Sequence, residues 1–297
     1  MTVILLAQLL VNGLAIGAGY ILIVVGLDII LRGTKILNFA HGQFYMLGAY
    51  ILFVEYEVLH LNFALSLVLC GLALLLLGAI SYLFVFSIVQ RRFALGATFS
   101  YRLLLSAMAS VGLMMILQQG TLLAFGTSGK GVSPVFTQMI VFSDYRLPLE
   151  RLAIILIAAL ALFGLYLLMF KTKLGKAMRA VCFDSEAASL QGINTFLIFL
   201  VCFAVGSALA GLAGGVIAPV FSVTPTMGTE VIFLAFLVLL IGGLGSYKGT
   251  ILGGILVGLA LSFGFQFFGG LSQLLVFILA IVILAFRPGG ILGEVFD

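Results

Sequence analysis

Three polar side chains stand together at the start of an otherwise apolar segment, Ile36–Tyr50, which reads ILNFAHGQFYMLGAY. Asn38, His41 and Gln43 could exchange hydrogen bonds with a small polar solute or with partners inside a helical bundle. In lipid such groups are costly unless they face protein or water. Asn38 could instead cap the following helix. The segment therefore predicts either part of a transport pathway or a helix start.

A second polar group stands before a later apolar segment and combines hydroxyl side chains with proline. Its members are Ser222, Thr224, Pro225, Thr226, Thr229 and Glu230. Irregular backbone is tolerated at membrane depth only beside protein or a water-filled cavity, although an ordinary turn outside the membrane also explains this composition. The candidates for lining a translocation path are Asn38, His41, Gln43, Thr224, Thr226 and Glu230.

The longest basic segment, Lys171–Asn194, reads KTKLGKAMRAVCFDSEAASLQGIN. Asp184 is a good helix N-cap, and Glu186 falls in the first turn that would follow it. Gly192 sits where a glycine would end that helix. We therefore expect two short helices at the membrane surface.

Near the junction of these two helices we expect the chain to present Met178, Arg179 and Ala180. The segment could dock a partner protein. It could also be an interfacial helix held to lipid phosphates by Lys171, Lys173 and Lys176.

The sequence contains no recognisable catalytic or nucleotide-binding motif. It contains no G-x-x-x-x-G-K-[ST] nucleotide-binding pattern, no G-x-S-x-G nucleophile motif and no metal-ligand spacing among its two histidines and three cysteines. Acidic residues lie near the ends of apolar segments, as Asp28 does four residues before Arg32. Proton- or sodium-coupled carriers usually keep such groups at mid-membrane. We expect a non-catalytic chain without cofactor or metal, driven by energy from elsewhere.

Composition identifies lipid as the solvent. The 297 residues are 64% hydrophobic and 8% charged, with a mean hydropathy of +1.36, whereas soluble domains carry about 25% charged residues. Continuous apolar runs such as Ile154–Phe170 exclude the alternating pattern of a barrel. The stretch Val3–Leu31 is too long for a signal peptide and is expected to remain as a span. An all-α transmembrane bundle follows, with no reason to expect nucleic acid as a partner.

Nine spans are predicted, the second and seventh short enough to be re-entrant, so the count is eight or nine. Their approximate bounds are 4–31, 37–54, 61–90, 103–125, 149–170, 195–218, 229–243, 250–267 and 271–286. An external N-terminus leaves three basic residues outside and the other 11 of 14 in the cytoplasm. The cytoplasmic residues are Arg32, Lys35, Arg91, Arg92, Arg102, Lys171, Lys173, Lys176, Arg179, Lys248 and Arg287. The C-terminus is then cytoplasmic.

Loops and glycines complete the organisation. The external loop Gly126–Leu147 has turn chemistry, and Lys171–Asn194 is too short for a domain, so residues 1–297 form one transmembrane domain. Glycines four apart, such as Gly13 and Gly17, indicate tight helix packing or helices that slide during transport.

Four motifs in order resemble the permeases of branched-chain amino-acid ABC transporters, specifically the shorter of the two paired permeases. They are LNFAHGQFYMLGAY (37–50), LGKAMRAVCFDSEAASLQGIN (174–194), GGLGSYKGTILGG (242–254) and FRPGGILG (286–293). The resemblance covers nearly the whole chain. Family members often have an acidic residue where this chain has Gln43.

The resemblance implies an importer permease fold in the bacterial inner membrane and alternating access. It implies a homologous second permease, two ATPase subunits that use ATP and Mg, and a periplasmic solute-binding protein as partners. The loop at about 171–194 would be the coupling helix on an ATPase. Its implied contact residues are Gly175, Met178, Arg179, Ala180, Asp184, Glu186, Ala187, Leu190 and Gly192.

The implied substrates are leucine, isoleucine and valine, with urea, short amides or aromatic acids as alternatives known among relatives. A stand-alone secondary carrier or channel, and a membrane scaffold without transport activity, are the alternatives from other classes.

Overall fold

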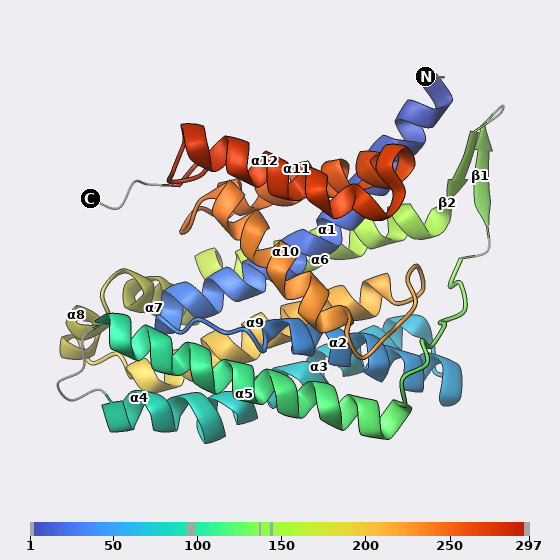
Figure 1. The fold of residues 1–297 in the computed structure, drawn as a ribbon. Coiled ribbons are helices and arrows are strands. Elements are labelled where there is room, and N and C mark those ends of the chain that lie inside the picture. The colour runs from blue at the N-terminus through green and yellow to red at the C-terminus, as the bar shows by residue number, and fades with distance from the viewer. Residues whose placement is uncertain (1–2, 94–98, 137, 143–144, 294–297) are drawn as a thin grey trace.

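The computed structural model describes residues 3–93, 99–136, 138–142 and 145–293, which form a bundle of helices with one short hairpin (Figure 1). The helices are α1 Val3–Thr34, α2 His41–Leu52, α3 Phe63–Ser81, α4 Ser87–Phe93, α5 Phe99–Phe125, α6 Leu149–Lys171, α7 Lys173–Phe183, α8 Ser185–Leu190, α9 Thr195–Ile217, α10 Met227–Gly242, α11 Tyr247–Phe268 and α12 Ser272–Phe286. Short π-helical segments, Phe53–Val58 and Tyr82–Phe86, extend α2 and join α3 to α4. The predicted helical fold is confirmed.

The core of the bundle is built around α1 and α9. Helix α1 packs against α11, α9 and α6, and α9 packs in addition against α2 and α3 (Figure 1). Most of α1 is buried, whereas α5 and α6 expose most of their apolar side chains. Exposed apolar faces are expected for helices that meet lipid or another membrane subunit.

Close contact between α1 and α11 depends on glycines of both helices. A Cβ atom on Gly17 would lie 2.8 Å from the carbonyl oxygen of Gly254, and one on Gly258 would collide with the backbone of Gly13 and Gly17. Because no side chain fits there, the two backbones touch directly. The tight packing predicted from the glycine spacing is confirmed at these positions.

Six stretches of the described residues are long and apolar enough to cross a membrane: Leu5–Thr34, Phe63–Arg91, Tyr101–Phe125, Leu149–Lys171, Thr195–Ile217 and Tyr247–Phe286. The last stretch contains both α11 and α12. They fold back on each other: Gly264 of α11 lies against Ser272 at the start of α12. Beyond α12, the backbone NH of Ile291 donates to the carbonyl oxygen of Ile241 in the last turn of α10. Helix α10 is apolar but shorter. The count of eight or nine spans stays a prediction.

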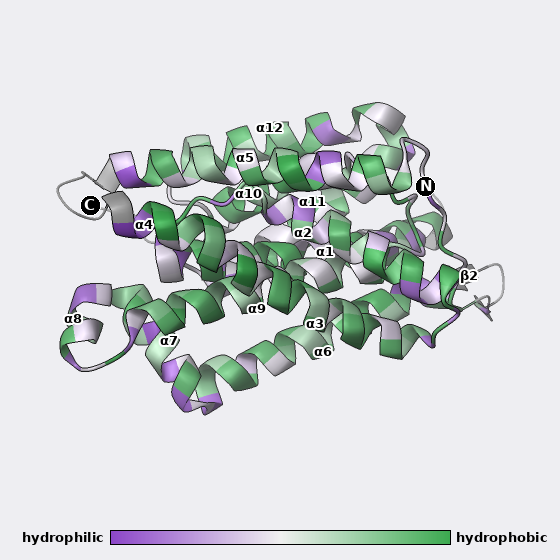
Figure 2. Cartoon of the chain, turned by 90° about the horizontal axis from the view of Figure 1, so that it is seen from below, coloured by the Kyte–Doolittle hydropathy of each residue, from purple (hydrophilic) through white to green (hydrophobic). Residues whose placement is uncertain are grey.

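Hydrophilic residues gather at the two ends of the bundle (Figure 2). One end, here called the loop end, carries α7 and α8, and α12 finishes there. The other, the hairpin end, carries strands β1 (Met139–Phe142) and β2 (Tyr145–Pro148), and α1 begins there (Figure 1). The start of α1 and the end of α12 therefore lie at opposite ends of the bundle, as they do when a chain crosses it an odd number of times.

The hairpin was not part of the prediction for the loop Gly126–Leu147. Its strands pair antiparallel, with Phe142 opposite Tyr145, so the all-α class holds for the bundle and not for this loop. The loop is tied to the bundle: Ser133 donates its backbone NH to the Glu57 carboxylate, and the backbones of Lys130 and Val223 exchange two hydrogen bonds. The side chains of residues 140–147 lie outside the description.

Candidate functional site

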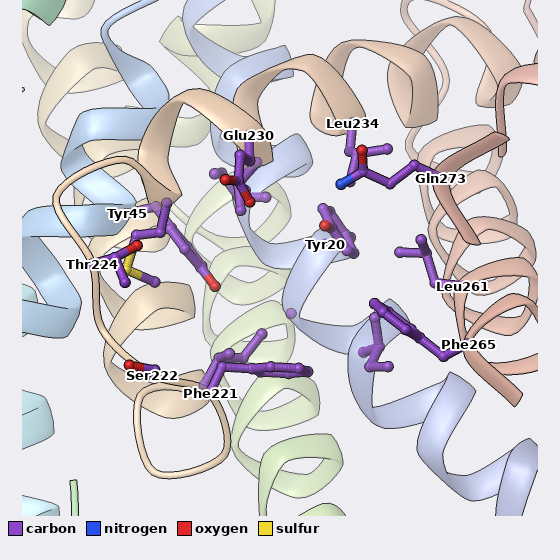
Figure 3. Close-up of a pocket in the computed structure, with 16 residues that line it drawn as sticks. Tyr20, Tyr45, Phe221, Ser222, Thr224, Glu230, Leu234, Leu261, Phe265 and Gln273 are labelled. Atoms are coloured by element: carbon purple, nitrogen blue, oxygen red, sulfur yellow. The ribbon is translucent and has the colours of Figure 1, made fainter. Parts of the chain in front are cut away.

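A cavity of about 360 Å³ opens in the half of the bundle nearer the hairpin end (Figure 3). It is enclosed by α1, α2, α10, α11, α12 and the segment between α9 and α10. Six polar side chains line it: Tyr20, Tyr45, Ser222, Thr224, Glu230 and Gln273. The rest of the lining is glycine and apolar side chains: Ile16, Gly19, Ile23, Ile217, Phe221, Met227, Val231, Leu234, Leu261 and Phe265. The volume suits a solute of amino-acid size.

The irregular segment before α10 positions three of these polar groups. Helix α9 ends at Ile217, and α10 begins at Met227; the chain between them is irregular and is held by turn hydrogen bonds such as that from the Val220 NH to the Ile217 carbonyl oxygen. The backbone pairing of Val223 with Lys130 fixes the middle of this segment. Glu230 lies in the first turn of α10, where a carboxylate is favoured by the helix dipole. The predicted irregular backbone beside a cavity is confirmed.

Tyr45 supplies a polar group from α2. Its side chain is 5% exposed, and its hydroxyl points into the cavity (Figure 3). No hydrogen bond to this hydroxyl is found among the described residues. A buried phenol normally finds a partner, so this hydroxyl is available to water or to a bound solute.

The predicted cluster at the start of α2 lies behind the cavity wall. His41 is fully buried, with Nε2 2.9 Å from the carbonyl oxygen of Ile23, a residue that lines the cavity. Gln43 is also buried, and its amide donates to the Thr229 hydroxyl at 3.3 Å. Thr229 in turn donates to Gln118 at 3.2 Å. These side chains connect α2 to α1, α10 and α5.

Asn38 does not cap α2. The N-cap position is Ala40, which makes no side-chain hydrogen bond, and both polar atoms of the Asn38 side chain are buried without a partner among the described residues. The capping interpretation is therefore wrong. Thr224 and Glu230 line the cavity, as predicted for a path, whereas Thr226 is exposed and lies outside the lining.

The loop 171–194 folds into the two predicted short helices, α7 and α8. Asp184 caps α8 by accepting hydrogen bonds from the backbone NH groups of Glu186 at 2.9 Å and Ala187 at 3.0 Å. Gly192 follows α8 with a φ of +80°, a conformation suited to glycine. The cap and the terminating glycine are both confirmed.

The surface of this loop differs from the prediction. Met178 is fully buried, so it is not presented at the surface. Gly175, one turn earlier, faces α6, whose carbonyl oxygens leave no room for a larger residue there. The Arg179 guanidinium lies over the Phe170 ring at 4.7 Å. Phe183, which the prediction did not include, is 95% exposed, and Leu190 is 87% exposed. The outward surface is therefore an apolar tip, Phe183 and Leu190.

The end of α1 joins this loop to the turn between α10 and α11. Arg32 pairs with Asp28 at 2.6 Å, donates to the carbonyl oxygen of Gly245 at 2.7 Å and lies over the Tyr247 ring at 4.4 Å. Three residues on, Lys35 donates to the carbonyl oxygen of Cys182 at the end of α7, at 3.5 Å. Burial raises the pKa of the Cys182 thiol, against the opposing effect of these two cations.

Comparison with known families decides the class of protein. The model of the family described as "branched-chain amino acid transport system / permease component" matches residues 9–285. The chain belongs to this family. The resemblance stated from the four sequence motifs is therefore confirmed, and the chain is a membrane permease.

Curated relatives cover almost the whole chain. It is 32% identical to the high-affinity branched-chain amino acid transport system permease protein BraD of Pseudomonas aeruginosa, over 97% of this chain and 95% of the relative. Identity to LivH of Escherichia coli, described in the same words, is 27% over the same shares. The ribose import permease RbsC of Escherichia coli is 30% identical over 58% of this chain and 56% of its own. No solved structure matches.

Sequence reasoning about this permease missed three cavity residues: Tyr20, Tyr45 and Gln273. Tyr45 had a signal, because it follows Gln43 by two residues in the same motif. Gln273 had another, as a polar residue at the start of the last apolar segment. Tyr20 stands alone in the apolar α1, and only the packing of α1 beside α10 places it at the cavity.

Proposed function

We propose that this permease is one of two membrane subunits of an ATP-driven importer. A solute-binding protein outside the membrane delivers the solute, two ATPase subunits bind and hydrolyse ATP with Mg, and a homologous second permease completes the path. No nucleotide, metal or other cofactor is bound by this chain, which acts as a single transmembrane domain over residues 1–297. The location we propose for this importer is the bacterial inner membrane.

The observation that carries this proposal is the apolar tip at the loop end. Phe183 and Leu190 expose their side chains almost completely on a loop whose other exposed residues are mostly polar or charged. Aromatic side chains are enriched in protein interfaces, and measurement of ATPase docking separates this interpretation from a lipid anchor, which also uses Phe and Leu. Docking on an ATPase would cover this tip and leave Ala180, Glu186 and Ala187 at its border.

Movement of the docked loop would reach the cavity through α1. Lys35 bonds to the end of α7, and Arg32 bonds to the turn before α11, so a shift of α7 acts on both. Helices α1, α10 and α11 also enclose the cavity. Alternating access then consists of ATP-driven movement of these helices around the solute. Thr224 and Glu230 line the path, with Asn38, His41, Gln43 and Thr226 beside it.

The solute we propose is leucine, isoleucine or valine. The names printed for BraD and LivH, together with the size and mainly apolar lining of the cavity, support this choice. Urea, short amides and aromatic acids are the alternative solutes.

Nine spans are proposed for a chain with an external N-terminus and a cytoplasmic C-terminus; the alternative of eight full spans and one re-entrant segment would leave both termini on one side. In a chain whose three cysteines are replaced, a cysteine at Ser128 near the hairpin end should react with an impermeant maleimide added to intact cells. A cysteine at Ser189 in α8 should react only after the membrane is opened. Both residues are exposed, so access depends on the side of the membrane. Labelling of both from one side would contradict the arrangement.

The importer function is tested by reconstitution. The chain, its second permease, its ATPases and its binding protein are placed in liposomes, and uptake of radiolabelled leucine is measured with ATP inside or outside the vesicle. We expect uptake only when ATP faces the ATPases, and none from this chain alone. Equal uptake by the chain without ATPases would identify a stand-alone carrier or channel instead.

A further inference from the structure

The cavity carries one charged side chain, and it is negative. Among the residues that line it, Glu230 is the acid and no lysine, arginine or histidine is present. Arg151 is a nearby cation, but it lies beyond Phe221, with its guanidinium 5.9 Å from that ring, and does not line the cavity. A solute inside therefore meets a carboxylate without a compensating basic group.

Two phenol hydroxyls share the space with this carboxylate. Tyr45 projects into the cavity from α2 and Tyr20 from α1, on either side of Glu230 (Figure 3). The Tyr45 residue is 5% exposed, and its hydroxyl makes no hydrogen bond among the described residues. A carboxylate and phenol oxygens are all acceptors, which suits a group with several N–H donors.

The opposite wall of the cavity is apolar. Leu261 and Phe265 from α11 and Phe221 before α10 lie across from Glu230 (Figure 3). A branched aliphatic group placed against these side chains would be removed from water, which favours binding. The cavity therefore has one acidic, hydrogen-bonding side and one apolar side.

We propose that this cavity selects solutes by their ammonium group, with Glu230 and Tyr45 as its binding residues. The solute's aliphatic chain lies against Leu261 and Phe265. Its carboxylate meets no basic side chain among the residues that line the cavity. Solutes that carry a carboxylate without an amine, including simple aromatic acids, are rejected by the negative charge. The inference rests on the proposed function and narrows its substrate class.

An acid in the first turn of a helix has an ordinary explanation in the helix dipole. That explanation accounts for Glu230 alone. It does not account for a second acceptor, the Tyr45 hydroxyl, which makes no hydrogen bond among the described residues and is directed into the same cavity from another helix. The pair is what points to a ligand.

The test uses three probes with the same branched chain: L-leucine, isopentylamine, which lacks the carboxylate, and 4-methylpentanoate, which lacks the amine. Binding to the assembled importer in nanodiscs is measured by saturation-transfer NMR without the binding protein, so that protein's selectivity does not contribute. We expect leucine and isopentylamine to bind at least about tenfold more tightly than 4-methylpentanoate, as a charge-assisted hydrogen bond gives.

Glu230→Gln should remove that preference, by weakening the two amines about tenfold and leaving 4-methylpentanoate no weaker. Tyr45→Phe should weaken the amines by a smaller factor. Glu55→Gln is the matched control, since it removes an acid near the hairpin end that does not line the cavity. It should change nothing. If Glu230→Gln fails to assemble, the Tyr45→Phe result and the three wild-type affinities test whether the cavity selects for the amine.

The inference is overturned if 4-methylpentanoate binds as well as isopentylamine, if no amine binds, or if Glu230→Gln keeps the wild-type preference. The proposed function is judged separately, by ATP-dependent leucine uptake in the liposomes. Uptake that needs ATP together with an unchanged preference in Glu230→Gln would refute the amine site and retain the importer. Uptake without ATPases would refute the importer whatever the preference.

Discussion

Replacing Phe183 with serine is expected to abolish solute-stimulated ATP hydrolysis by the assembled importer while leaving the permease folded. Phe183 is the last residue of α7 and is 95% exposed, so its side chain contributes almost nothing to packing within the chain. Aromatic residues at the centre of an interface commonly contribute about 2–4 kcal/mol to binding. That loss weakens ATPase docking by roughly 30-fold to 1,000-fold. The measurements are ATPase co-purification and stimulated phosphate release.

Phe286→Ser is the matched control. Phe286 is 84% exposed and ends α12 at the same loop end, but it lies outside the α7–α8 loop. It removes the same apolar surface and should leave stimulation intact. Full stimulation in Phe183→Ser, or equal loss in both variants, would show that the apolar tip does not transmit ATPase movement and would return the loop to a lipid anchor.

Replacing Arg32 with methionine is expected to destabilise the permease by about 3–5 kcal/mol, as removal of one partner from a buried ion pair does. The change leaves the fully buried Asp28 side chain without its cation. It also removes the hydrogen bond to Gly245 and the contact with Tyr247, which hold the turn before α11. Unfolding of the purified chain in mixed micelles, followed by circular dichroism during denaturant titration, measures the loss.

The double variant Asp28→Leu with Arg32→Met separates the charge from the other contacts. It removes the unpaired carboxylate as well, so it should be more stable than Arg32→Met alone, although less stable than the wild type because the Gly245 bond stays lost. Equal stability of the single and double variants would show that the buried charge does not dominate. Wild-type stability in Arg32→Met would show that the pair contributes nothing.

These two predictions concern opposite ends of one mechanical link. Movement of the ATPase would act on the chain at the apolar tip, and Arg32 connects the end of α1 to the turn before α11. Helices α1 and α11 both border the cavity, through Tyr20 and Leu261. A variant that weakens Arg32 should therefore disturb transport even where ATPase docking is intact.

Local chemistry made part of the structure predictable. Asp184 and Gly192 define the ends of α8 because capping depends on residues within one helical turn. Asp28 and Arg32 pair because four residues along a helix bring side chains together. Glycines four apart mark close helix contacts, and composition alone requires a membrane. The four motifs identified the family.

Burial and long-range contact were decided only by the tertiary structure. Met178 lies two residues before Ala180 on the same short helix, yet Met178 is buried and Ala180 is exposed, because only one face of α7 packs against α1, α6 and α9. Tyr20 and Tyr45 reach one cavity because α1 and α2 pack beside α10, a contact between segments about 200 residues apart in the chain. A local sequence pattern determines the hydrogen bonds within one turn of a helix. A cavity depends on how several helices pack against one another, and this packing cannot be read from the sequence of any one helix.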